Sequence, residues 1–219
     1  MLGNPFDFVT YIRDNVAHFL SLLGQHIELT VVSVALGLAI GLPLGVLASR
    51  VRALAGPMTW LAGVGQTIPS LAILGLTLPF LGIGFRPSVF ALTVRAILPI
   101  FINTYVGITS ADRATLDAAR GMGASTTQQL LLVELPLASP VIYAGVQTAT
   151  VQTIGIATLA AFIGGGGLGD LILQGLAMVD PAILLAGAVP VALLAMGADI
   201  ALGRLRRVVV PAGLRVGAI

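Results

Sequence analysis

Four long stretches of the sequence carry no charged residue, and this feature constrains the fold more than any other. A helix that crosses the hydrocarbon core of a membrane needs about 20 mostly apolar residues. The uncharged stretches reach or approach this length, with 21, 33, 35 and 18 residues in 29–49, 53–85, 135–169 and 181–198. A further apolar stretch, 88–110, is interrupted only by Arg95. The sequence therefore predicts an all-α membrane protein with about five transmembrane helices.

The composition excludes several other classes of protein. Only 9% of the residues are charged, whereas an average soluble domain carries about 25%, so a soluble enzyme or a nucleic-acid-binding protein is a poor fit. The chain has no Cys and two His. This excludes thiol catalysis and zinc–thiolate sites and speaks against a multi-histidine metal site. We expect no metal and no nucleic-acid partner.

The arginines predict the orientation of the spans. With five spans and the N-terminus outside, Arg13 and Arg86 fall outside and eight arginines fall on the cytoplasmic side. Because Lys and Arg are enriched in cytoplasmic loops, this split favours an N-out, C-in topology. Dividing 53–85 into two spans would destroy the asymmetry, so we predict one long span there. The eight cytoplasmic arginines are Arg50, Arg52, Arg113, Arg120, Arg204, Arg206, Arg207 and Arg215.

Three regions are expected along the chain. Residues 1–26 mix aromatic and charged side chains, which predicts an amphipathic segment in the membrane interface. Residues 27–203 are expected to form the transmembrane domain, and residues 204–219 a cytoplasmic tail.

Small residues recur along the first predicted span. Gly37, Gly41 and Gly45 follow one another at four-residue spacing, which places them on one face of a helix and lets another helix approach closely. We expect this face to pack within the chain, with a contact to another subunit as the alternative.

The longest connection between the predicted spans is the polar stretch 111–136. Its pattern predicts a helix over 112–120, a glycine break at 121–123 and a second helix over 126–135. Pro136 has no backbone N–H, so we expect it to end the second helix and to mark the entry to the next span. From periodicity alone, a helix pair lying on the membrane surface explains the segment equally well.

This stretch resembles the EAA loop of the permease subunits of ABC importers. Asp117, Ala118 and Ala119 are followed by Gly123 and then by Leu135–Pro136, with the spacing of the Glu-Ala-Ala, Gly and Leu-Pro pattern of that family. Asp117 stands where Glu is usual, and we expect this shorter carboxylate to weaken a contact there. Segments elsewhere resemble the osmoprotectant branch of the family, which carries glycine betaine, choline or carnitine. They are 66–72, 82–87, 98–100, 103–105, 157–164 and 166–170.

The resemblance implies a fold, a location and partners. The fold is the type I ABC importer permease fold with cytoplasmic coupling helices, in a prokaryotic cell (inner or plasma) membrane. The loop 111–136 would dock on a cytoplasmic ABC ATPase, a second permease chain (identical or a sibling) would pair with this one, and an extracytoplasmic binding protein would deliver the substrate. The substrate would be a compatible solute, and a permease for methionine or another small amino acid is the alternative within the class.

Several sequence features argue against catalysis or nucleotide binding by this chain. The sequence has no lysine, and a Walker P-loop requires one, so ATP and Mg²⁺ are expected on the partner ATPase and this chain is not expected to be an enzyme. Gly164, Gly166 and Gly169 match the dinucleotide-binding spacing, but they follow an apolar span instead of a strand, which favours a turn. An ion-coupled secondary carrier is the alternative of a different class. It would require intramembrane carboxylates and an inverted repeat, and the sequence suggests neither.

Polar residues at membrane depth are the candidates for a translocation path. Arg95 is the only charge well inside a span, and snorkelling to the outer headgroups is favoured over contact with a substrate carboxylate. Quaternary ammonium ions are commonly bound by aromatic cages, and only 5% of this chain is aromatic. High-affinity recognition is therefore expected in the binding protein. The path candidates are Gln66, Thr67, Ser70, Arg95, Asn103, Gln147, Gln152 and Thr153.

Overall fold

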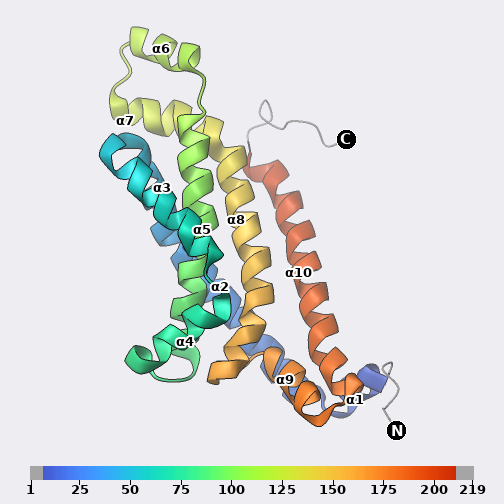
Figure 1. Cartoon of the computed structure of the whole chain (residues 1–219). Helices are drawn as coiled ribbons and strands as arrows, with labels where there is room; N and C mark the ends of the chain where they lie inside the picture. Colours follow the sequence, from blue (N-terminus) through green and yellow to red (C-terminus); the bar gives the residue numbers. More distant parts are fainter. Residues whose placement is uncertain (1–6, 211–219) are drawn as a thin grey trace.

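The computed structural model describes residues 7–210, a range that contains helices and turns but no strand (Figure 1). The long helices run between two opposite ends of the bundle, and the short ones lie at these ends. In chain order the elements are α1 (Phe8–Asp14), α2 (Val16–Arg50), α3 (Arg52–Thr67), α4 (Ser70–Leu81), α5 (Phe85–Thr109), α6 (Arg113–Gly121), α7 (Thr126–Gln129), the π-helix η2 (Leu130–Glu134), α8 (Leu135–Ala157), the 3₁₀-helix η3 (Thr158–Ile163), α9 (Gly169–Met178) and α10 (Pro181–Val209).

Four segments are long and apolar enough to cross a membrane: α2, α5, the run Thr126–Ile163 and α10. The pair α3–α4 passes the same test only when its two helices are taken together, and it brings the number of spans to five if it counts as one. The chain direction bends by 100° between the two helices of this pair.

The predicted span over 53–85 is therefore divided into two helices, and a single crossing of the membrane there would be a broken span. α3 ends at Thr67, and Ile68 adopts an extended conformation with ψ 127°. The cause is Pro69, because a proline disfavours the helical conformation of the residue before it. The absence of charge over 53–85 correctly predicted an apolar segment, but it carries no information about a bend within that segment.

The first span also begins earlier than its uncharged run suggests. α2 is continuous from Val16 to Arg50, so the predicted boundary between 1–26 and 27–203 falls inside a helix. α1 and the first turns of α2 make up the described part of the predicted interfacial segment. Residues 1–6 and 211–219, including Arg215, lie outside the described residues.

The centre of the bundle is formed by α2, α5 and α8. The glycine face of α2 lies against α5, since a Cβ atom at Gly37 would stand 2.7 Å from the Cβ of Ala96. On the other side of α5, a Cβ atom at Gly145 of α8 would stand 2.6 Å from the Cβ of Asn103. Such close backbone approach maximises van der Waals contact between helices in lipid. The small residues on α2 are thus used for packing within the chain.

The second loop helix does not end at Pro136 as predicted. α7 continues through the π-helical turn η2 into α8, and the N–H of Leu135 bonds to the carbonyl of Leu130, five residues back. Pro136 then occupies the first turn of α8, where its missing N–H breaks no required hydrogen bond. Because the hydrogen bonds change from four-residue to five-residue spacing in η2, the helix continues through the proline without interruption.

Glycines turn the chain after the 3₁₀-helix η3. Gly164, Gly166 and Gly167 have φ values of +71°, +77° and +87°, a region that only glycine adopts readily. The N–H of Gly167 donates a hydrogen bond of 3.1 Å to Oε1 of Gln25 on α2. The glycine cluster therefore forms a turn fixed against the first span.

The two ends of the bundle differ in their arginines. α6 and α7 lie at the same end as the C-terminal end of α10, which carries Arg204, Arg206 and Arg207 (Figure 1). α1, α4 and α9 lie at the opposite end. The arrangement of elements thus places the described arginines of the predicted cytoplasmic set at one end.

Candidate coupling loop and translocation path

The first helix of the loop, α6, begins with a side-chain cap. The carboxylate of Asp112 accepts hydrogen bonds from the hydroxyl of Thr115 (2.8 Å) and from its backbone N–H (2.9 Å). These bonds, chiefly that from the hydroxyl, hold the pKa of Asp112 below its ordinary value. The cap is therefore charged at neutral pH and stabilises the positive end of the helix dipole.

The glycine turn that follows α6 depends on one backbone conformation. Gly123 has φ +86°, and its N–H donates to the carbonyl of Arg120 at 2.9 Å. Two residues later, Ser125 and Gln128 form a reciprocal capping box that starts α7. The turn between the two helices is therefore defined by local sequence on both sides.

The acidic residue of the EAA pattern lies on the outer face of α6. The carboxylate of Asp117 accepts from Nη1 of Arg120 at 3.2 Å, and both side chains are largely exposed. Nε of Arg120 also donates to Oε1 of Gln129 at 3.2 Å. This guanidinium therefore links α6 to α7, while the carboxylate of Asp117 stays accessible.

The other residues of the pattern differ in exposure. Ala118 is exposed and Ala119 is buried, so the helix turns one alanine towards solvent and one towards the bundle. Leu135 and Pro136 are half-buried at the start of α8. Met122, next to the glycine turn, is 84% exposed, so an apolar side chain stands free at the tip of the loop.

A buried ion pair connects this loop to the first span. Arg50, the last residue of α2, donates through Nη1 to Oε1 of Glu134 at 3.1 Å and through Nη2 to Oε2. The side chain of Glu134 is only 5% exposed, whereas that of Arg50 is 31% exposed. Glu134 is the last residue of the π-helical turn. A two-pronged contact of this kind fixes orientation as well as position.

Our sequence reasoning missed this pair, although a signal was present. Arg50 is the first charge after one uncharged run and Glu134 the last before another. Both therefore lie at the ends of predicted spans on the same side of the membrane, with opposite charges. A search for such boundary pairs would have found it.

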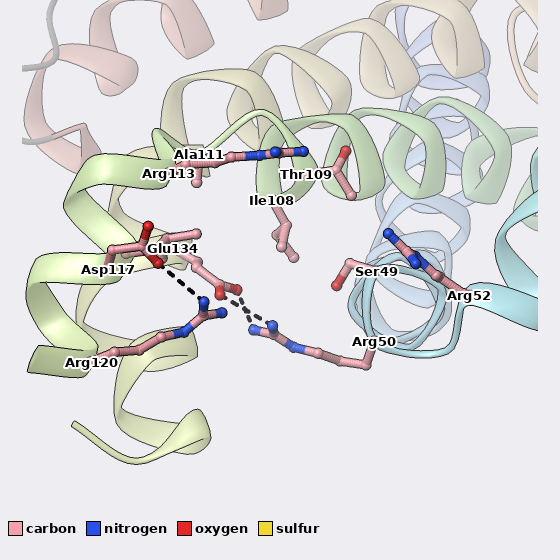
Figure 2. A pocket seen from close by; sticks show the side chains of 11 residues that line it. Ser49, Arg50, Arg52, Ile108, Thr109, Ala111, Arg113, Asp117, Arg120 and Glu134 are labelled. Atoms are coloured by element: carbon pink, nitrogen blue, oxygen red, sulfur yellow. Dashed lines mark hydrogen bonds and ion pairs between the residues drawn. The ribbon is translucent and has the colours of Figure 1, made fainter. Parts of the chain in front are cut away.

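A polar cavity of about 580 Å³ lies between the loop and the ends of the spans. Figure 2 shows Arg50 and Glu134 meeting at one side of it, and Asp117 and Arg120 paired at another. Arg52 and Arg113 extend towards each other from opposite sides of the cavity. The cavity is thus lined by four arginines and two carboxylates.

Arg95 lies at the break between α3 and α4. Its Nη1 donates to the carbonyls of Gly65 (3.3 Å) and Gln66 (3.2 Å), at the end of α3. The carbonyls in the last turn of a helix have no intrahelical partner, and Arg95 supplies one. The guanidinium is therefore directed at the end of another helix, and the expectation that it snorkels to the headgroups stays a prediction.

The predicted path residues fall into separate groups. Gln66, Thr67, Ser70 and Arg95 come together at the α3–α4 break. Asn103 donates to the carbonyl of Pro99 in its own helix, at 2.8 Å.

The remaining path candidates all lie on α8. Nε2 of Gln147 donates to Oδ1 of Asp199 on α10 at 2.6 Å. Gln152 is exposed, and Thr153 is buried. Within residues 7–210 the eight candidates do not converge on one site.

The helical bundle with its polar loop defines a class of membrane transport protein, and the comparisons identify the family. Residues 37–211 match the family described as "Binding-protein-dependent transport system inner membrane component". Since the match covers most of the chain, this protein belongs to that family. It is a multi-pass component of the inner membrane, as predicted.

Relatives of known name cover nearly the full chain. The choline transport system permease protein OpuBB of Bacillus subtilis is 42% identical over 94% of this chain and 95% of its own length. The osmoprotectant import permease protein OsmW of Salmonella typhimurium is 42% identical over 95% of this chain and 100% of its own length. The resemblance to osmoprotectant permeases is thereby confirmed.

Solved structures share the fold. A chain of the inward-facing MetNI methionine ABC transporter superposes with a TM-score of 0.80 at 23% identity, covering 88% of this chain and 96% of its own. A chain of an amino acid ABC transporter crystallised with histidines has a TM-score of 0.72 at 18% identity. These likenesses concern the fold alone, and they confirm the predicted fold class of a type I importer permease.

Proposed function

We propose that this chain is the permease subunit of an importer for quaternary ammonium osmoprotectants, such as choline, glycine betaine or carnitine. The observation that carries the substrate class is the 42% identity to the choline transport permease over 94% of this chain. The methionine transporter shares the fold at only 23% identity. A permease for methionine or another small amino acid therefore ranks second.

The importer requires further subunits. Five spans are few to enclose a path, so a second permease chain, identical or a sibling, completes it. The sequence lacks the lysine of a P-loop, so ATP and Mg²⁺ bind to a cytoplasmic ABC ATPase. The low aromatic content leaves high-affinity recognition of the ammonium group to an extracytoplasmic binding protein.

The loop 111–136 is the contact with that ATPase. Coupling two sites requires a contiguous element with two discrete positions. The cap of Asp112 and the link between Arg120 and Gln129 support the view that α6 and α7 move as one piece. The ion pair between Glu134 and Arg50 ties that piece to the end of α2. Movement of the loop would thus be passed directly to the first span.

Two groups of polar residues are proposed to line the path at different depths. Broken helices at membrane depth commonly line a cavity, because their free backbone groups need partners. This supports the group at the α3–α4 break, Gln66, Thr67, Ser70 and Arg95. The second group lies on α5 and α8 and comprises Asn103, Gln147, Gln152 and Thr153.

Transport in proteoliposomes tests the proposed function. The chain is reconstituted with its ATPase and its binding protein, and the uptake of labelled choline, glycine betaine, carnitine and methionine is measured with and without ATP. We expect ATP-dependent, vanadate-sensitive uptake of at least one of the three ammonium compounds. Uptake of methionine alone would instead establish the amino-acid alternative. Uptake driven by an ion gradient without ATP would indicate a secondary carrier.

A further inference from the structure

The polar cavity beside the loop contains arginines that the ion pairs described above do not neutralise. Glu134 is engaged by Arg50, and Asp117 by Arg120. Both acidic residues that line the cavity are therefore already paired. The two remaining arginines of the lining, which are Arg52 and Arg113, give the cavity a net positive charge.

The free arginines come from different elements and approach the same space. Arg52 is the first residue of α3, and Arg113 is the first residue of α6. Both extend into the cavity from opposite sides, with the hydroxyl-bearing Thr109 between them in the view (Figure 2). Two guanidinium groups that line the same space suit a phosphate, which accepts several charge-assisted hydrogen bonds at once.

The position of the cavity indicates the source of the phosphate. Arg50 ends α2, Arg52 begins α3 and Thr109 ends α5, so the cavity lies where three apolar helices stop. The hydrocarbon core gives way to the lipid headgroups where transmembrane helices end, so we expect the cavity at the depth of the headgroups. Basic pockets between transmembrane helices at this level bind anionic headgroups. A volume of about 580 Å³ has room for a headgroup phosphate.

We propose that Arg52 and Arg113 form a binding site for the phosphate headgroup of an anionic phospholipid. The site shares Arg113 with the loop that is proposed to contact the ATPase, and it lies apart from the proposed substrate path. It requires neither of them to be correct, because lipid binding can be measured on the isolated full chain.

Native mass spectrometry of the full chain, released from nanodiscs that contain phosphatidylglycerol and phosphatidylcholine, tests the site. We expect retained phosphatidylglycerol on the unmodified chain. The double variant Arg52→Gln/Arg113→Gln should bind it about 25-fold more weakly, because each arginine near an anionic surface contributes roughly a factor of five. Neither side chain is engaged in an ion pair or hydrogen bond within the described chain, so folding should be preserved.

Matched controls separate the site from general charge effects. Arg204→Gln/Arg206→Gln removes the same charge at the same end of the bundle and should retain the lipid. Arg52→Lys/Arg113→Lys keeps the charge and should retain most of it. Equal retention in the Gln double variant and the unmodified chain would overturn the proposal. So would equal losses in the two Gln double variants.

A second arm distinguishes lipid from free anion. The chain in phosphatidylcholine nanodiscs is titrated with inorganic phosphate, and its melting temperature is followed. A lipid site predicts no shift at millimolar phosphate. A saturable shift that Arg52→Gln/Arg113→Gln abolishes would reassign the site to a soluble anion and overturn the lipid proposal.

Discussion

The stability of this bundle depends strongly on two kinds of residue. They are the glycines that face another helix and the charged residues at buried helix ends. Neither makes a contact that a similar residue could replace. A glycine facing a helix permits an approach that any Cβ atom prevents, and a buried carboxylate requires its cation. Substitutions at these positions should therefore have large effects on stability.

Gly45→Ala is expected to destabilise the contact between α2 and α5. The new Cβ would lie 2.6 Å from the Cβ of Thr104 and 3.0 Å from the carbonyl oxygen of Phe101, so the two helices must separate. Overpacking of this kind lowers the free energy of unfolding by about 1–3 kcal/mol. Thermal unfolding in detergent, followed by circular dichroism, measures the change.

Gly24→Ala is the control, since it lies on the same helix with no atom within 4 Å of its added Cβ. It should be neutral or slightly stabilising, because alanine favours helix over glycine by about 1 kcal/mol. Equal melting temperatures for the two variants would show that α2 and α5 do not pack through this face.

Arg50→Gln is expected to destabilise the chain more than loss of an exposed ion pair. It leaves the carboxylate of Glu134, which is 5% exposed, without its cation, and breaking a buried pair in this way lowers stability by about 3–5 kcal/mol. The charge-reversed double variant Arg50→Glu/Glu134→Arg should recover much of the loss. A double-mutant cycle of unfolding free energies measures the coupling.

Arg13→Gln removes the exposed pair with Asp14 and provides the comparison. Exposed pairs contribute about 0–1 kcal/mol, so this variant should unfold almost like the parent chain. If Arg50→Gln behaved in the same way, Glu134 would have to be solvated in the membrane-bound protein.

The elements of this fold differed in how well the sequence predicted them. The uncharged runs located α2, α8 and α10, and the apolar stretch interrupted by Arg95 located α5, because apolar length is a property of sequence alone. The cap of α6 and the turn at Gly123 were also predictable, because both depend on local chemistry.

Other features depended on competing local effects or on tertiary contacts. A proline can break a helix at the residue before it, or it can be accommodated in the first turn of a helix. The sequence alone did not show that the first effect operates at Ile68 and the second at Pro136. The ion pair of Arg50 with Glu134 and the cap that Arg95 provides for α3 join residues far apart in the chain. Periodicity does not reveal such contacts, although the position of Arg50 and Glu134 at the ends of uncharged runs was a signal for their pairing.

Gly123→Val is expected to uncouple ATP hydrolysis from transport. The residue has φ +86°, and a β-branched side chain there is strained, so the turn between α6 and α7 must change shape. Under the proposed coupling role, ATP-dependent uptake in proteoliposomes falls strongly, while the ATPase keeps its basal hydrolysis. Paired assays of uptake and phosphate release measure the two rates.

Gly121→Ala is the matched substitution. Gly121 lies two residues earlier, within α6, with no positive φ and open space around its added Cβ. It should transport normally. Unchanged uptake and unchanged stimulation of the ATPase in Gly123→Val would remove this turn from the coupling mechanism.

At the scale of the whole molecule, the bent pair α3–α4 decides the topology. If it crosses the membrane once, the chain has five spans and its two ends lie on opposite sides. If it returns to the side from which it entered, only four spans remain. In Figure 1 the pair starts near the loop end of the bundle and finishes near α5's first residue at the other end. This arrangement and the arginine distribution both favour one crossing.

Single cysteines can test this topology directly, because the chain contains none of its own. Ile83, between α4 and α5, is 80% exposed, and Met122, in the loop, is 84% exposed. We expect a membrane-impermeant maleimide to label Ile83→Cys in intact spheroplasts and to label Met122→Cys only after permeabilisation. Arg13→Cys and Arg204→Cys mark the outer and the cytoplasmic side as references. Protection of Ile83→Cys together with labelling of Arg13→Cys would mean that α3–α4 is re-entrant. The later spans would then need a different orientation, and the loop 111–136 could not be assigned to the cytoplasm by its arginines.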